Sequence, residues 1–159
     1  HSYLIDAVYQ MKQKGVAGFQ VLIFGKGGLK GKLLSQIERL GLVQEVKLTG
    51  IAPVEEIMAI SDVFTLPSLW EGLSIALLQA MNAGCPIVAT KISGTNEALE
   101  NKTSALLIDP GEVTQLSEAL RRVISDRELR QTLAEGAKEQ VKKFSIEENV
   151  KVIENLIWP

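Results

Sequence analysis

The chain has 159 residues, of which 46% are hydrophobic and 23% are charged, and its formal net charge is −2. This length suits one domain with a full core. The slightly acidic balance argues against nucleic acid or an anionic membrane as a direct partner, because such binders are usually clearly basic. No apolar stretch approaches the roughly 20 residues of a membrane span. The single cysteine, Cys85, excludes an internal disulfide, so the expected location is cytoplasmic.

The first predicted element is an amphipathic helix over residues 2–15. Its apolar residues recur at a spacing of three or four, as in Leu4, Ala7, Val8 and Met11. No strand precedes this helix. Because α/β domains normally open on a strand, we expect the first strand of this domain to be absent from the sequence.

Strands and helices alternate along the next hundred residues. The predicted strands cover residues 19–24, 46–49, 63–66, 86–89 and 105–108, and the helices between them cover 29–40, 53–61, 73–83 and 94–99. This alternation predicts a Rossmann-like α/β fold, in which a doubly wound parallel sheet has helices on both faces. The helix over 73–83 is apolar almost all round and is therefore predicted to be buried.

From Val113 onward the pattern predicts only helices, including a C-terminal tail with Val150, Ile153 and Ile157 on one side. We expect Trp158 to pack against the last helix or against another domain. Neither a linker nor an internal repeat interrupts the chain, so residues 1–159 are predicted to form a single domain.

Ligands of open parallel sheets bind outside the carboxyl ends of the strands. Four segments lie at those ends, residues 25–28, 50–51, 67–72 and 91–95, and each of them contains glycine. Glycine lets a backbone come close to a bound group, and two of these loops lead into helix N-termini, which favour an anion such as a diphosphate.

The loop from Gly25 to Lys32 does not match better-known phosphate-binding patterns. Its glycines Gly25 and Gly31 are one residue too far apart for a P-loop, and Leu33 stands where Ser or Thr is needed. Lys30 occupies the third glycine position of the dinucleotide fingerprint. A tight turn with solvated lysines remains an alternative interpretation.

A carboxylate lies just before the helix over 73–83, and a side-chain amide lies inside that helix. Glu71 precedes the helix and could simply cap it, but a cap does not account for Gln79 two turns later, since a buried amide needs partners. Residues eight apart lie within about 80° around a helix, so both side chains could face one crevice. With the amides of Gly72, Leu73 and Ser74, they suit a sugar linked to a nucleoside diphosphate.

Seven segments, in this order and spacing, are similar to those of a known family. They are VLIFGKG (21–27), LTG (48–50), SDVFTLPS (61–68), WEGL (70–73), AMNAGCPIVAT (80–90), GTNE (94–97) and LLIDPG (106–111). From Phe19 to about Ser145 the chain resembles the C-terminal, donor-binding domain of family 4 retaining glycosyltransferases, which is one half of a GT-B fold.

The resemblance implies roles for individual residues. Glu71 takes the catalytic-site position that hydrogen-bonds the donor sugar, and the implied donor-binding residues are Gly25, Lys26, Gly27, Gly50, Ile51, Gly72, Leu73, Ser74 and Gln79. Gln79 departs from the family, which has a second glutamate there for the ribose. An uncharged amide accepts a weaker hydrogen bond from a hydroxyl, which puts ribose affinity and turnover in question.

The resemblance also implies what lies outside the sequence. The family's paired Arg and Lys on the diphosphate, its histidine and its acceptor site belong to upstream segments, so Lys26 and Lys91 are the nearest cationic substitutes. The intact enzyme would transfer a hexosyl group from a UDP-, GDP- or ADP-sugar with retention and without a metal or other cofactor. Peripheral membrane association of the full enzyme stays open, and the chain alone is expected to bind the donor weakly and to transfer nothing.

Two other functions remain as alternatives. A non-catalytic module that binds a nucleotide sugar or a partner is made plausible by Gln79. A GT-B epimerase would need catalytic carboxylates and a histidine that this segment lacks, since its only histidine is His1.

Overall fold

The structure, a computed structural model, describes residues 1–157, apart from the side chains of residues 149, 152 and 156. The expected packing of Trp158 lies outside the described residues. The elements in chain order are α1 (Ser2–Gln13), β1 (Val21–Phe24), α2 (Lys30–Arg39), β2 (Val46–Gly50), α3 (Val54–Ala59), β3 (Phe64–Leu66), α4 (Ile75–Ala83), β4 (Ile87–Thr90), α5 (Ser93–Ala98), β5 (Leu106–Ile108), α6 (Val113–Ser125), α7 (Arg127–Val141), the 3₁₀ helix η1 (Lys142–Phe144) and α8 (Ile146–Ile157). Each predicted strand and helix is present.

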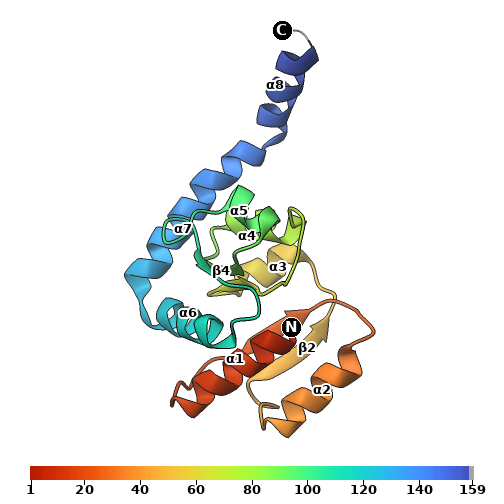
Figure 1. Ribbon diagram of the computed structural model, residues 1–159, viewed down its shortest axis with the longest axis vertical. Helices are drawn as coiled ribbons and strands as arrows, with labels where there is room; N and C mark the ends of the chain where they lie inside the picture. Colours follow the sequence, from red (N-terminus) through yellow and green to blue (C-terminus); the bar gives the residue numbers. More distant parts are fainter. Residues whose placement is uncertain (158–159) are drawn as a thin grey trace.

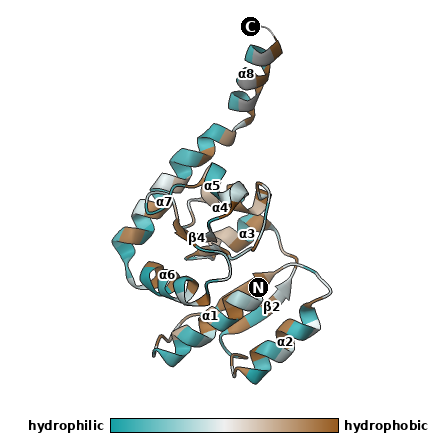
Figure 2. Cartoon of the chain, in the orientation of Figure 1, coloured by the Kyte–Doolittle hydropathy of each residue, from teal (hydrophilic) through white to brown (hydrophobic). Residues whose placement is uncertain are grey.

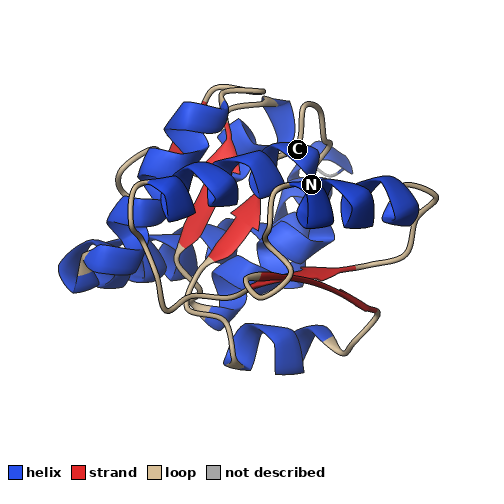
Figure 3. Ribbon diagram, turned by 90° about the horizontal axis from the view of Figure 1, so that it is seen from below, coloured by secondary structure: helices blue, strands red, loops and turns tan. Residues whose placement is uncertain are grey.

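All strand pairings are parallel, as predicted, but the described strands form two sheets rather than one. β1 pairs with β2, with Val21 opposite Val46, and β3, β4 and β5 form a second sheet in that order. Figure 3 shows the strands in two groups enclosed by helices. The architecture is Rossmann-like, and the division into two sheets is the difference from the prediction.

Two apolar clusters lie on opposite faces of the β3–β5 sheet. On β4 every residue is buried, with Val88 in one cluster and Ile87 and Ala89 in the other. Side chains of successive strand residues alternate between faces, so a strand buried on both sides is apolar throughout. The first cluster also contains Ile23 of β1 and Val46 of β2, so the two sheets share one core.

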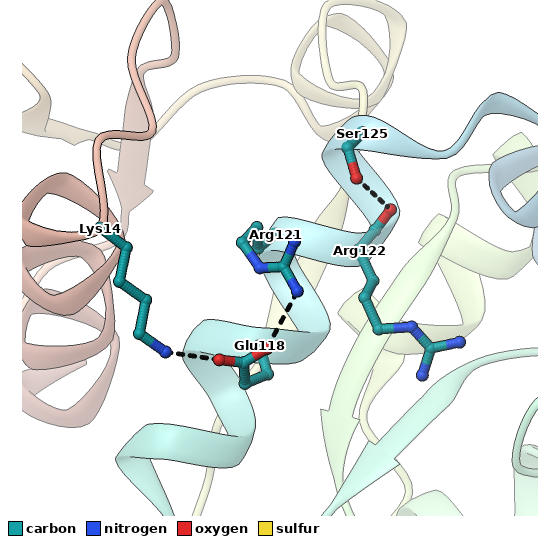
Figure 4. A network of polar contacts seen from close by, with 5 residues as sticks. All are labelled: Lys14, Glu118, Arg121, Arg122 and Ser125. Carbon is teal, nitrogen blue, oxygen red and sulfur yellow. Dashed lines mark hydrogen bonds and ion pairs between the residues drawn. The ribbon is translucent and has the colours of Figure 1, made fainter.

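Helix α1 packs beside α6 and contributes five buried residues, Leu4, Ile5, Ala7, Val8 and Met11, to the first cluster. At the rim of this contact Lys14 pairs with Glu118, which also accepts a hydrogen bond from Arg121 at 3.1 Å (Figure 4). The hydrogen bond from Lys14 is the main cause that lowers the pKa of Glu118. Because these groups are solvated, the pairing contributes little to stability.

The predicted helical C-terminal part is confirmed. Outer helices such as α6 and α7 carry both hydrophilic and hydrophobic segments (Figure 2), as amphipathic helices do. Helix α8 extends away from the rest of the molecule (Figure 1) and exposes Ile146, Val150, Ile153 and Ile157.

Two helical glycines should respond in opposite ways to substitution by alanine. A Cβ at Gly31 in α2 would meet nothing within 4 Å, whereas a Cβ at Gly136 in α7 would overlap the carbonyl group of Thr103. We expect Gly31→Ala to raise the free energy of unfolding by about 0.5 kcal/mol through helix propensity. We expect Gly136→Ala to lower it by about 1–3 kcal/mol through overpacking. Urea denaturation of both variants checks this, and equal effects would contradict the described packing.

Candidate functional site

The carboxyl ends of β1 and β2 are joined by two glycines. The amide of Gly25 donates to the carbonyl of Gly50 at 2.6 Å, and the hydroxyl of Thr49 donates to the carbonyl of Ile23 at 3.3 Å. Gly25 and Gly50 have φ angles of +132° and +84°, which residues with a side chain rarely adopt. At the sheet edge both loops therefore carry a glycine, which has no side chain. The adjoining Lys26, Gly27 and Ile51 are exposed.

A second loop follows β3 and carries Glu71. Thr90, buried at the end of β4, donates its hydroxyl to the carbonyl of Ser68 at 2.6 Å and to that of Leu66 at 3.3 Å. Ser68 in turn donates to Oε2 of Glu71 at 3.2 Å. The end of β4 thus fixes the loop through Thr90, and Ser68 of the loop fixes the half-buried carboxylate of Glu71 just before α4.

Helix α5 fixes the other side of this loop. The space beside Gly94 is filled by the backbone of Gly72 and Leu73, so that a Cβ at Gly94 would overlap the carbonyl of Gly72. The turn before α5 is held by Thr95, whose hydroxyl donates to the carbonyl of Thr90 and accepts from the amide of Ile92 at 3.1 Å. The Gly72–Leu73 backbone therefore has a fixed position, and both residues are exposed.

Helix α4 begins immediately after these amides. Its N-cap is Ser74, whose side chain makes no capping hydrogen bond, and the amide of Leu78 donates to the carbonyl of Ser74 at 3.1 Å. The alternative in which Glu71 caps this helix is wrong, because the carboxylate precedes the N-cap by three residues and contacts Ser68. The N-terminus of α4 can thus present backbone amides, and its positive dipole end, to an anion.

Gln79 lies on the outward side of α4. The prediction that this helix is buried all round is wrong: Leu77, Ala80 and Met81 are buried, but Ile75 is 73% exposed. Helix α4 buries one side in the cluster that contains Ile87 and Ala89 of β4, and hydropathy does not show which side that is. Gln79 is half-buried and lines a surface hollow between α4 and α7, next to Lys138 and Phe144.

The residues that line this hollow are Ile75, Leu78, Gln79, Asn82, Lys138, Val141, Lys142, Phe144 and Ser145, and Glu71 is not among them. The structure therefore brings Glu71 together with the amides that follow it, but it does not show Glu71 and Gln79 facing one pocket. The requirement for buried partners, from which the role of Gln79 was inferred, does not apply to a half-exposed side chain.

The other residues singled out in the sequence are either exposed at the surface or buried in the core. Lys26 and Lys91 are exposed, and Trp70 is 85% exposed beside Glu71. Cys85 is buried, as expected of a small hydrophobic residue, and burial raises the pKa of its thiol to about 11. Among the residues that the structure describes, no three His, Cys, Asp or Glu side chains form a group suited to a metal ion.

Sequence reasoning gave no roles to Thr90, Gly94 and Thr95, which position the Glu71 loop. A signal was available, because polar Thr90 ends an otherwise apolar strand, and a buried hydroxyl needs a partner. Gly94 belongs to a segment that the resemblance quoted, but its neighbour in space, Gly72, cannot be inferred from spacing along the chain.

Comparison with known proteins identifies the family. The model of the glycosyl transferases group 1 family matches residues 1–140. The chain belongs to this family. One similar relative is an alpha-D-kanosaminyltransferase of Streptomyces kanamyceticus, which is 30% identical over 85% of this chain and 36% of that protein. Another is the amylovoran biosynthesis glycosyltransferase AmsK of Erwinia amylovora, which is 36% identical over 75% of this chain and 31% of that protein. The chain thus spans about a third of the length of these group 1 relatives.

Solved structures of other proteins share the fold. Anabaena HepE, in a crystal structure with UDP-glucose, superposes on 97% of this chain and 44% of its own with a TM-score of 0.86 and 28% identity. The C-terminal domain of LpcC from Francisella tularensis has a TM-score of 0.80 at 24% identity, over 91% of this chain and 79% of that domain. The Rossmann-like domain of a GT-B glycosyltransferase, predicted from the sequence, is confirmed. No helix within residues 1–157 has the length and apolar character of a membrane span.

Proposed function

We propose that this chain is the donor-binding domain of a glycosyltransferase that transfers a hexosyl group from a nucleoside-diphosphate sugar to an acceptor with retention of configuration. One observation carries the proposal: the carboxylate of Glu71 is held by Ser68 directly before the exposed Gly72–Leu73 backbone and the N-terminus of α4. A hydrogen-bond acceptor for hydroxyls thus lies beside a site for an anion. HepE, which binds UDP-glucose in its crystal structure, supports a nucleotide sugar as the ligand.

In this proposal the diphosphate lies at the N-terminus of α4. Backbone amides and the helix dipole stabilise the negative charge that grows on the leaving diphosphate as the glycosidic bond breaks. Glu71 accepts hydrogen bonds from sugar hydroxyls, and such charge-assisted bonds are about twice as strong as neutral ones. Lys26 adds positive charge near the phosphates, and we propose that transfer needs no metal ion.

The nucleoside is proposed to contact Gly50 and Ile51, and the ribose is proposed to lie at Gln79 because the family holds the ribose at this position. We expect Gln79→Glu to tighten the binding of a nucleoside diphosphate about tenfold, because a carboxylate accepts a ribose hydrogen bond more strongly than an amide. Isothermal calorimetry measures this, with Asn82→Asp, which adds the same charge in the same hollow, as the matched control. Equal or weaker affinity in Gln79→Glu, or the same gain in Asn82→Asp, would remove the ribose role of Gln79.

The acceptor is proposed to bind a separate N-terminal domain, since the chain corresponds to about a third of its relatives' length. The chain alone should then bind the donor weakly and transfer no sugar. Donor binding is tested by a thermal-shift screen of UDP-, GDP- and ADP-sugars. The sugars of one of these nucleotides should raise the melting temperature of the chain. No shift with any of them at millimolar concentration would contradict the proposal.

A non-catalytic module that binds a nucleotide sugar or a partner is the second candidate, and Gln79 favours it because the family has a glutamate there. The test is whether a longer polypeptide, in which this chain is joined to an N-terminal domain of family length, transfers sugar. The enzyme should do so and the module should not. If NMR detects sugar transfer and the product keeps the anomeric configuration of the donor, the result supports the retaining enzyme. Donor binding without turnover supports the module.

A further inference from the structure

Exposed apolar side chains gather on the segment that contains Glu71. They belong to Leu69, Trp70, Leu73 and Ile75. Trp70 is 85% exposed, which is the largest fraction among the exposed large hydrophobic residues that the structure describes. Single exposed apolar residues are ordinary on a protein surface, whereas a cluster of them beside polar groups marks a binding surface. The function proposed above assigns no role to the indole of Trp70.

The backbone on both sides of Trp70 is fixed. Before it, the carbonyl of Ser68 accepts a hydrogen bond from the buried hydroxyl of Thr90 at 2.6 Å. After it, the carbonyl of Gly72 fills the space beside Gly94 in α5. A flexible loop would account for an exposed tryptophan without any ligand, but this loop is tied to the rest of the fold at both ends. The indole is therefore a large flat surface that is held in place in advance of binding, which lowers the cost of binding a ligand.

The position of Trp70 relative to Glu71 indicates which ligand meets the indole. The transferred sugar is proposed to contact Glu71, and the diphosphate is proposed to contact the backbone that follows, up to the N-terminus of α4. Trp70 precedes Glu71, so it lies at the other end of this series of contacts. The acceptor must come next to the transferred sugar, and the exposed surface available on that side of Glu71 is formed by Trp70 and Leu69.

The chemistry of this surface favours a sugar ring over other acceptors. A pyranose ring has apolar C–H groups on its faces and hydroxyl groups around its rim. An indole offers a wide apolar contact at a low cost in conformational entropy, and the neighbouring carboxylate of Glu71 can accept hydrogen bonds from hydroxyls. A purely apolar acceptor would instead cover the charged Glu71 without giving it a hydrogen-bond donor, which is costly.

We propose that Trp70 is a specificity-determining residue for the acceptor, and that the acceptor is a saccharide whose pyranose ring stacks on the indole. The inference rests on the proposed function, because it needs a donor sugar at Glu71. It adds a contact from this chain to an acceptor that is otherwise bound by a separate domain.

The test titrates the ¹⁵N-labelled chain with the methyl α-glycosides of glucose, mannose and galactose and follows the indole N–H of Trp70 and the amide of Glu71 by NMR. At least one glycoside should shift both signals and reach saturation, with a dissociation constant of about 1–10 mM. Trp70→Leu keeps an apolar side chain but removes the flat ring, so the affinity should fall about tenfold, whereas Trp70→Phe should stay within about threefold.

Ile60→Ala is the matched control, because it removes another exposed apolar side chain, next to the C-terminus of α3. It should leave the affinity for the glycoside unchanged. Three results would overturn the proposal: no shift with any of the three glycosides, equal affinity in Trp70→Leu, or a larger response to 1-hexanol, which would indicate an apolar acceptor.

The sugar nucleotide separates this inference from the proposed donor site. Its affinity should stay within about twofold in Trp70→Leu, because the donor is bound by Glu71 and backbone amides. A larger loss would place the indole on the donor and would also overturn the proposal. If the unmodified chain binds a glycoside at Trp70 but no sugar nucleotide, the donor site is contradicted and the stacking of a saccharide on Trp70 is supported.

Discussion

Replacing Glu71 with alanine is expected to weaken binding of the donor nucleotide sugar about 100-fold. Glu71 is held at 3.2 Å by Ser68, directly before the backbone that is proposed to bind the donor. Each charge-assisted hydrogen bond contributes about 1.5–3 kcal/mol, so losing one or two bonds to sugar hydroxyls corresponds to a factor of this size. Calorimetric titration with the sugar nucleotide selected by the thermal-shift screen measures the change.

Two comparisons isolate the sugar contact. The affinity of Glu71→Ala for the nucleoside diphosphate alone should stay within about twofold of the unmodified chain, because the diphosphate contacts backbone amides. Glu100→Ala removes a different carboxylate, an exposed one in the segment after α5, and should leave both affinities unchanged. Unchanged sugar-nucleotide affinity in Glu71→Ala would show that Glu71 does not bind the sugar.

Gly94→Ala is expected to have the largest combined effect on stability and binding. The added Cβ would overlap the carbonyl of Gly72 and press on the amide of Leu73, and both are backbone atoms that cannot move aside without shifting the loop. Overpacking of this kind lowers the free energy of unfolding by about 1–3 kcal/mol. Since the same backbone is proposed to bind the donor, affinity should fall about tenfold or more.

Gly28→Ala serves as the matched control. A Cβ at Gly28 meets nothing within 4 Å, and its φ is not in the left-handed region, so its stability should change by less than about 0.5 kcal/mol. Urea denaturation and calorimetry of both variants separate the two effects. Wild-type stability in Gly94→Ala would mean that α5 does not contact the Glu71 loop as described.

The strands and helices were predictable because their signals are local. A continuous apolar run such as residues 86–89 predicts a strand buried on both faces, and β4 is buried at every position. The glycine-bearing loops that follow each strand predicted the sheet edge at which Gly25, Gly50 and Glu71 lie. The family's sequence pattern added residue roles that periodicity alone does not provide.

The errors concern contacts between segments distant in sequence. The apolar composition of α4 could not show that one of its sides is exposed, because that depends on how α7 packs beside it. The support of the Glu71 loop by Thr90 and Gly94 arises where the loop after β3 meets the turn between β4 and α5 in space.

The central claim is that the donor binds at the carboxyl ends of the strands, against the backbone that follows Glu71. Its most direct test is an NMR titration of the ¹⁵N-labelled chain with the sugar nucleotide, which detects weak binding residue by residue. We expect the amide signals of Gly25, Gly50, Gly72, Leu73 and Ser74 to shift and to reach saturation. Shifts confined to the hollow lined by Gly15 to Gln20 and Glu45, or none at all, would contradict it.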